Sequence, residues 1–376
     1  MVEYGTPLAK PAGEGAGARA EETVMNSRER VLKTLRFDKP DRAPRDLWLI
    51  PAVEKTRLAE LEAVREKYPI DFAFPNGFRA WNMGHIVEWP DPSMLFRYGP
   101  AKRARGTPWE GTYVDAWGSV WVTGEDGVLG EVKQPPLADW SALVSYSPPW
   151  EVLEGAQWDA VNHFCAAVDK FVLSPPALSL FERMQFLRGS EALYMDLGYG
   201  SREVLKLRDM VHEFNLKALD YWCRTDMDGI AWPDDWGSQK ALLVSPAMWR
   251  EMFKPLYKEY CDIIHRAGKF VFLHSDGHIA AIIEDLIEIG VDALNSQLFC
   301  MNIEDIGRRF KGRVTFWGEL DRQYVLPFGK PEEVREAVRR VRRALDDGSG
   351  GVVAQFQFGK YDPRENVEAA FEAWLE

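Results

Sequence analysis

Cysteine is scarce in this chain, and its few cysteines form no recognisable group. Cys165, Cys223, Cys261 and Cys300 lie far apart in the sequence, and no Cys-x-x-Cys pair occurs. This spacing argues against a disulfide framework. It fits a reducing compartment, and we therefore expect a cytoplasmic location.

Long apolar runs and nucleotide-binding motifs are also missing. No run of roughly 18 consecutive apolar residues occurs, and the N-terminus lacks the basic-then-apolar pattern of a signal peptide, so the sequence predicts no membrane span and no secretion. The absence of a P-loop and of a Gly-x-Gly-x-x-Gly motif argues against the usual nucleotide sites. Lys and Arg total 46 against 58 Asp and Glu, a net charge of −12. An acidic surface repels phosphate backbones, so we expect no nucleic-acid partner.

What the chain does have is enough apolar sequence for a core, arranged in short runs. Of its 376 residues, 46% are hydrophobic. Eight short apolar runs alternate with helical patterns and predict parallel strands at residues 46–50, 71–74, 170–173, 229–232, 270–274, 293–294, 314–317 and 352–356. Eight strand–helix units predict an α/β fold, a (β/α)8 TIM barrel, although an open doubly wound sheet would share the pattern.

Two segments depart from this alternation. Residues 1–24 are rich in Gly, Ala, Pro and Glu, and we expect a disordered tail before a single domain at residues 25–376. Residues 117–132 predict a β-hairpin insertion between the second and third strands. Long loops of barrels usually cover the active-site mouth, so we expect a lid there.

Catalytic groups of barrels lie at the carboxyl ends of the strands, which here carry acidic residues and tryptophan. The candidate acids and bases are Asp235, His274, Asp276 and Glu319. The candidate substrate-binding residues are Trp48, Arg79, Trp117, Trp121, Trp232, Trp236, Gln297, Trp317 and Gln355. This set favours a flat or aromatic small molecule as substrate.

His274 and Asp276 form the densest cluster of polar residues at a strand end. They are two residues apart, so both side chains can point to the same side of the strand, and a third ligand from another strand would complete a Zn²⁺ site. Alternatively, Asp276 caps the next helix and His274 is a hydrogen-bonded residue of the barrel rim.

Several short segments together match one family pattern. They are residues 27–32 (SRERVL), 40–44 (PDRAP), 130–137 (GEVKQPPL), 235–239 (DWGSQ), 274–277 (HSDG) and 326–334 (LPFGKPEEV). In these segments the chain resembles the uroporphyrinogen decarboxylase superfamily, which also holds the corrinoid-linked methyltransferases. The resemblance covers about residues 25 to 376, and it implies a (β/α)8 barrel.

The signatures of both well-known activities are altered. Members that decarboxylate uroporphyrinogen carry an arginine-rich stretch after the first strand, where this chain reads LIPAV at residues 49–53. A substrate with many carboxylates needs cations to bind it. The zinc methyltransferases carry His-x-Cys at the fifth strand, where this chain has His274-Ser275-Asp276. Oxygen ligands would make Zn²⁺ more Lewis-acidic and less suited to thiolate chemistry.

The resemblance therefore implies methyl transfer as the first hypothesis. A methylated or methoxylated small molecule would donate its methyl group to the corrinoid of a separate protein, with Zn²⁺ held by His274 and Asp276 and with Asp235 as acid or base. The second hypothesis is cofactor-free decarboxylation of a carboxylated substrate, and the third is a non-catalytic ligand-binding barrel. The outer helices could also support a homodimer.

Overall fold

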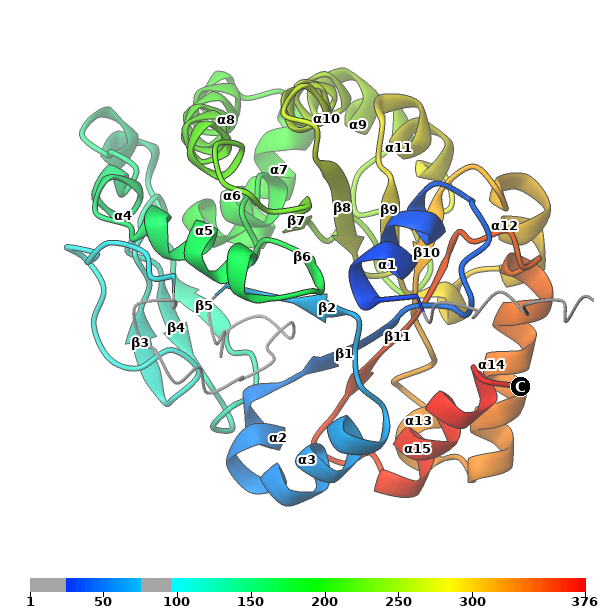
Figure 1. Cartoon of the computed structure of the whole chain (residues 1–376). Helices are drawn as coiled ribbons and strands as arrows, with labels where there is room; N and C mark the ends of the chain where they lie inside the picture. The colour runs from blue at the N-terminus through cyan, green and yellow to red at the C-terminus, as the bar shows by residue number, and fades with distance from the viewer. Residues whose placement is uncertain (1–24, 76–95) are drawn as a thin grey trace, which may run out of the picture.

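The computed structural model describes residues 25–75 and 96–376, and its centre is a curled sheet of six parallel strands (Figure 1). The strand order is β1 (Arg45–Leu49), β11 (Val352–Phe358), β10 (Thr315–Trp317), β9 (Ala293–Ser296), β8 (Phe270–Ser275) and β7 (Gly229–Pro233). Every residue of β7, β9, β10 and β11 is buried. Strands that are buried along their whole length are typical of a parallel sheet covered on both faces.

Two further parallel strands, β2 (Phe72–Ala73) and β6 (Phe171–Val172), pair with each other. The backbone N–H of Asp71 donates to the carbonyl of Arg45 at 2.9 Å, and Leu173 forms a parallel bridge with Gly229. These contacts connect the pair to β1 on one side and to β7 on the other. The structure thus has a mixed α/β fold built on a curled, six-stranded parallel half-barrel.

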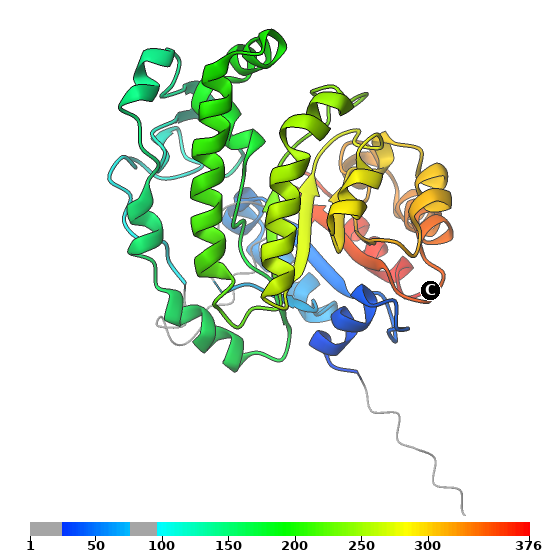
Figure 2. The ribbon, with the colours of Figure 1, turned by 90° about the horizontal axis from the view of Figure 1, so that it is seen from above.

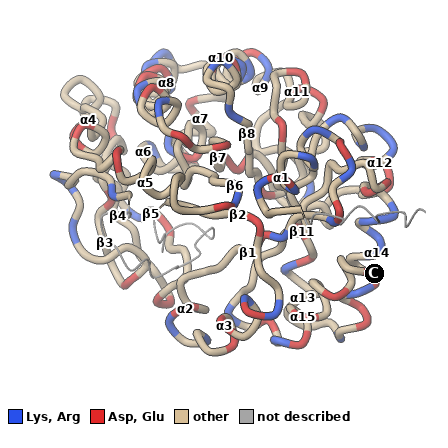
Figure 3. Tube along the Cα trace, viewed as in Figure 1, with Lys and Arg blue, Asp and Glu red and all other residues tan. Residues whose placement is uncertain are grey.

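Helices stand on the outside of the curled sheet (Figure 2). They are α1 (Ser27–Leu35), α2 (Pro51–Thr56), α3 (Leu58–Lys67), α4 (Trp150–Glu154), α5 (Trp158–Ala167), α6 (Phe181–Arg188), α7 (Ser190–Tyr199), α8 (Arg202–Trp222), α9 (Pro246–Met252), α10 (Lys254–Arg266), α11 (Ile283–Ile289), α12 (Ile303–Phe310), α13 (Val325–Phe328), α14 (Pro331–Leu345) and α15 (Arg364–Ala373), with short 3-10 helices at Trp140–Val144 and Leu298–Cys300. Acidic and basic side chains are interspersed along the outer helices (Figure 3). None of the helices described is long and apolar enough to cross a membrane.

The space enclosed by the strands is filled by large aromatic side chains. Trp48, Phe72, Phe171, Phe272 and Trp317 belong to one buried cluster, together with residues of α1. The indole N–H groups of Trp48 and Trp317 both donate to Asp46 Oδ2 at 2.9 Å, which satisfies their polar atoms inside the core. The strand bundle is therefore a packed core whose chemistry must lie at its ends.

The segment between β2 and β6 differs from the expected two-stranded hairpin at 117–132. It forms a three-stranded antiparallel sheet of β3 (Thr112–Val114), β4 (Val120–Val122) and β5 (Glu131–Gln134). Three residues carry too little alternation to identify β3 from sequence. Gly118 has a φ of +91° and forms part of the turn between β3 and β4 rather than a strand. A role for this sheet as a lid stays a prediction.

Candidate active site

Three predicted residues meet at the carboxyl ends of β7 and β8. His274 Nε2 lies 3.4 Å from Asp235 Oδ1 and 3.5 Å from Asp276 Oδ1. One ligand atom of each residue lies within 4.8 Å of the others. Asp235 and Asp276 are also tied through the backbone, because the Asp276 N–H donates to Asp235 Oδ1 at 2.8 Å. We call Asp235, His274 and Asp276 the triad.

The orientation of the His274 ring is set by Asn295 on the neighbouring strand β9. Asn295 Nδ2 donates to the Trp317 carbonyl and, at 2.8 Å, to Gln355 Oε1, so its Oδ1 is left to face His274. That oxygen lies 2.6 Å from His274 Nδ1 and can only accept, which puts a proton on Nδ1. The Nε2 of a neutral His274 then turns its lone pair toward two carboxylates. Such an arrangement calls for a proton or a cation between them.

A cation fits the triad by its donor chemistry. Asp276 Oδ1 is buried and has no hydrogen-bond partner in the described part of the chain. Imidazole nitrogen and carboxylate oxygen are both ligands that Zn²⁺ takes in proteins, and catalytic zinc sites with three protein ligands leave a further position open. The expected pair of His274 and Asp276 therefore gains Asp235, which the sequence indicated only as an acid or base.

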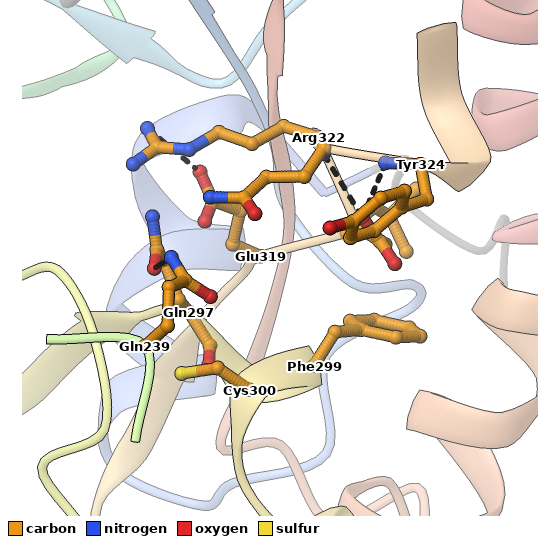
Figure 4. Close-up of a pocket in the computed structure, with 10 residues that line it drawn as sticks. Gln239, Gln297, Phe299, Cys300, Glu319, Arg322 and Tyr324 are labelled. Carbon is orange, nitrogen blue, oxygen red and sulfur yellow. Dashed lines mark hydrogen bonds and ion pairs between the residues drawn. The ribbon is translucent and has the colours of Figure 1, made fainter. Parts of the chain in front are cut away.

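Arg322 and Glu319, which follow β10, lie on the other side of Asp276. Arg322 binds Asp276 Oδ2 and donates to Gln357 Oε1 at 2.8 Å. It also lies 3.4 Å from Glu319 Oε1 (Figure 4). Glu319 is only 2% exposed. Burial raises the pKa of Glu319 to about 7 although the charge of Arg322 opposes it, and the negative charge of Asp276 raises it further. Glu319 can therefore exchange a proton near neutral pH.

A small pocket opens beside Glu319 and Arg322. It measures about 70 Å³ and is lined in part by Gln239, Gln297 and Tyr324. Gln297 accepts hydrogen bonds from the Gly277 N–H at 3.1 Å and from Gln239 Nε2 at 3.3 Å. The predicted residue Gln297 thus lies in the wall of the site.

Two adjacent aspartates at the end of β7 have different functions. Asp234 accepts the backbone N–H groups of Leu180, Phe181 and Glu182 at 2.8, 3.0 and 2.7 Å, and so anchors the start of α6. Asp235 points to the triad instead. Burial, together with the negative charge of Asp276, raises the pKa of Asp235 to about 6. This places Asp235 in the range of a general base or acid.

Glu182 on α6 is a buried carboxylate that the sequence analysis did not identify. It is 7% exposed, and its Oε2 has no hydrogen-bond partner among the described residues. Burial and the negative charges of Asp235 and Asp234 raise the pKa of Glu182 well above its ordinary value. The predicted strand ends supplied the candidate residues, and Glu182 lies on a helix, so no sequence pattern identified it.

The predicted substrate-binding residues occupy three different environments. Trp48 lies edge-on to the His274 ring, 5.1 Å between centroids, while Gln355 is buried beside Asn295. Trp232, Trp236 and Trp317 are at most 1% exposed and pack inside the fold. Trp117 and Trp121 belong to the insertion, where Trp121 stacks on Tyr113. Arg79 lies outside the described residues. Substrate contact stays a prediction for all of these residues.

Comparison with known proteins agrees with this architecture. The sequence pattern of the family "Uroporphyrinogen decarboxylase (URO-D)" matches residues 181–374, just over half of the chain. A uroporphyrinogen decarboxylase of Neisseria gonorrhoeae is 26% identical over an alignment of 181 residues, and the match covers 43% of this chain and 48% of that protein. The chain thus matches about half the length of this curated relative.

Among solved structures, a methyltransferase from Methanosarcina mazei superposes with a TM-score of 0.66 at 14% identity. The superposition covers 93% of this chain and 98% of that one. At this identity the likeness concerns the fold. The family match, which includes the β7 and β8 strand ends that carry the triad, shows that this chain belongs to the uroporphyrinogen decarboxylase family.

Proposed function

We propose that this chain is a methyltransferase that moves a methyl group from a methylated or methoxylated small molecule to the corrinoid of a separate protein. The observation that carries the proposal is the triad, in which His274 Nε2 and two carboxylates converge. One of the buried carboxylate oxygens, Asp276 Oδ1, has no hydrogen-bond partner among the described residues. Zn²⁺ bound there would act as a Lewis acid toward an ether oxygen. The fold of the Methanosarcina mazei methyltransferase supports the same kind of reaction.

The residues around the triad are suited to handling a proton on oxygen. Glu319, with a pKa near 7, can protonate an oxygen that leaves with its electron pair when the methyl group departs. Arg322 lies against Asp276 and Glu319 and offsets part of their negative charge. Trp48 holds the His274 ring from one side, and Asn295 fixes its tautomer. These contacts would keep the reacting groups in one geometry before the substrate arrives.

The same site is poorly suited to a carboxylated substrate. Of the residues that line the small pocket, Arg322 is the cation, and it already contacts Asp276 and Glu319. The acidic residues of this lining are Glu319 and Asp321, so a substrate carboxylate would find no free cation among the lining residues. Decarboxylation of a porphyrinogen or another acid is therefore the alternative rather than the main proposal.

We further propose that the eight parallel strands close into one (β/α)8 barrel in a single domain. The hydrogen bond from Asp71 to Arg45 and the bridge from Leu173 to Gly229 support closure, because they lie on either side of the β2–β6 pair. A cytoplasmic location and a homodimer remain part of the proposal.

The test combines metal analysis with a transfer assay. We expect about one Zn²⁺ per purified wild-type chain and transfer of the methyl group of 2-methoxyphenol to cob(I)alamin, measured by its change in absorbance. The double variant His274→Ala/Asp276→Ala should lose both the metal and the transfer. His265→Ala is a matched control, because His265 pairs with Asp292 at 2.8 Å outside the site.

An unchanged metal content in the double variant would refute the ligand assignment. Decarboxylation of uroporphyrinogen that survives in the same variant would favour the alternative.

A further inference from the structure

A second and larger cavity lies beside the insertion, and none of the triad residues lines it. It has a volume of about 370 Å³. Its walls come from the loop after β6, from α4, α6 and α8, and from the turn between β3 and β4, which lie on one side of the molecule (Figure 1). Residues of the segment 98–101 and Pro233, the last residue of β7, also line it. This volume falls within the range of small-molecule sites in proteins.

The walls of this cavity are mostly apolar and held in place. Trp117 packs edge-on against Phe214, 4.7 Å between ring centroids, and its carbonyl accepts the hydroxyl of Tyr146 at 2.6 Å. Leu153 and Leu178 complete the apolar lining, and each is at most 4% exposed. A preformed apolar cavity favours an apolar body, which need not compete with well-bound water.

The charged groups of the cavity neutralise each other. Arg183 Nη1 lies 2.9 Å from Asp115 Oδ2, and the Arg183 guanidinium stands 5.1 Å from the Trp117 ring centre. Asp115 also accepts the Trp121 indole N–H at 3.2 Å and the Ser119 backbone N–H at 2.9 Å. Among the residues that line the cavity, neither an anion nor a cation would find an unpaired opposite charge.

One polar residue of the lining, Ser179, has a side-chain hydroxyl that forms no hydrogen bond with the described residues. Ser179 Oγ is buried and has no hydrogen-bond partner in the part of the chain that the structure describes. The neighbouring Asn215 cannot supply a donor to it, because its Nδ2 donates to the Ser179 carbonyl at 3.2 Å and to the Tyr260 hydroxyl at 3.3 Å. A buried hydroxyl without a partner is costly, and a ligand atom that pairs with it would recover that cost.

We propose that this cavity binds an uncharged aromatic molecule with one hydroxyl or ether oxygen, which pairs with Ser179. The ring would lie against Trp117 and Phe214, and the oxygen would face Ser179 Oγ. None of the triad residues lines this cavity, and the proposal does not depend on methyl transfer.

The experiment compares two probes that differ by one hydroxyl, 4-methylphenol and toluene, by calorimetric titration of the full chain. We expect 4-methylphenol to bind one site per chain. Ser179→Ala should weaken 4-methylphenol about fivefold while leaving toluene unchanged, because the variant removes a single hydrogen bond. Ala177→Leu, which places extra carbon atoms in the lining, should abolish binding of both probes.

The control is the triad variant His274→Ala/Asp276→Ala, which should bind both probes as the wild type does. Ser179→Ala removes one unpaired oxygen and should fold normally even if Ala177→Leu does not. Equal affinities of wild type and Ser179→Ala for 4-methylphenol would overturn the proposal. The proposal would also be overturned if His274→Ala/Asp276→Ala lost the binding of 4-methylphenol while Ser179→Ala kept it, because the probe would then occupy the triad.

Discussion

At the scale of single residues, the site depends on side chains from strands other than the one that carries His274. Asn295 directs His274 through one 2.6 Å hydrogen bond, and its own amide is held by Trp317 and Gln355. A group that accepts a hydrogen bond from a metal-binding histidine fixes its tautomer and ring orientation, and losing that group commonly weakens metal binding.

We therefore expect Asn295→Leu to weaken the proposed zinc binding by about 10- to 100-fold. The leucine has a similar size but cannot accept the His274 Nδ1–H, so the ring loses its fixed tautomer. Competition with a chromophoric chelator measures the affinity. Asn302→Ala, which removes a helix cap from α12 on the surface, should leave the affinity unchanged. Zinc affinity in Asn295→Leu equal to the wild-type value, in a folded protein, would contradict this account.

At the scale of elements, one strand end positions both the site and a helix. Asp234 accepts three N–H groups at the start of α6 and the hydroxyl of Tyr257. The first N–H groups of a helix have no partner inside it, so a buried carboxylate stabilises them. The same turn directs Asp235 to the triad and places Glu182 behind it.

Replacing Asp234 by Ala should lower the free energy of unfolding by about 3 kcal/mol, because three buried N–H groups lose their acceptor. Urea denaturation measures the loss. Asp139→Ala is the matched comparison, since Asp139 caps an exposed 3-10 helix through the Ser141 N–H at 2.7 Å, and it should cost about 1 kcal/mol or less. Similar losses in the two variants would argue against the anchoring function of Asp234.

At the scale of the whole molecule, the stability of the fold depends on pH through a buried carboxyl group outside the site. Asp362, after β11, is 4% exposed and accepts the Gly359 N–H at 2.6 Å. Burial raises the pKa of Asp362 to about 6, although that N–H and the charge of Arg57 oppose the shift. The folded chain thus binds this proton more tightly than the unfolded chain, whose Asp pKa is about 3.9. Asp362 therefore makes the fold less stable as the pH rises from about 4 to about 6.

Asp362→Asn removes this dependence because asparagine stays neutral. The free energy of unfolding of the variant, relative to wild type, should increase by about 2 to 3 kcal/mol between pH 4 and pH 7. Urea titrations of both proteins at the two pH values measure the difference. A difference that does not change with pH would show that Asp362 keeps an ordinary pKa in the folded protein.

The strand positions could be predicted from local pattern alone. The eight apolar runs coincide closely with β1, β2 and β6 to β11, because a buried parallel strand must be apolar on both faces whatever its neighbours are. The three residues of β3 were missed, since so short a strand owes its existence to pairing with β4. His274 and Asp276 were found because their spacing puts them on one side of a strand end.

The sequence by itself determined the strand–helix order, the acidic character of the strand ends and the superfamily. Only the tertiary structure showed that Asp235 lies within 3.4 Å of His274, and that Arg322, Asn295 and Glu182 surround the triad. The physical reason is that these contacts join separate strands and helices. Their geometry depends on the stagger and curvature of the sheet, which no local pattern of residues encodes.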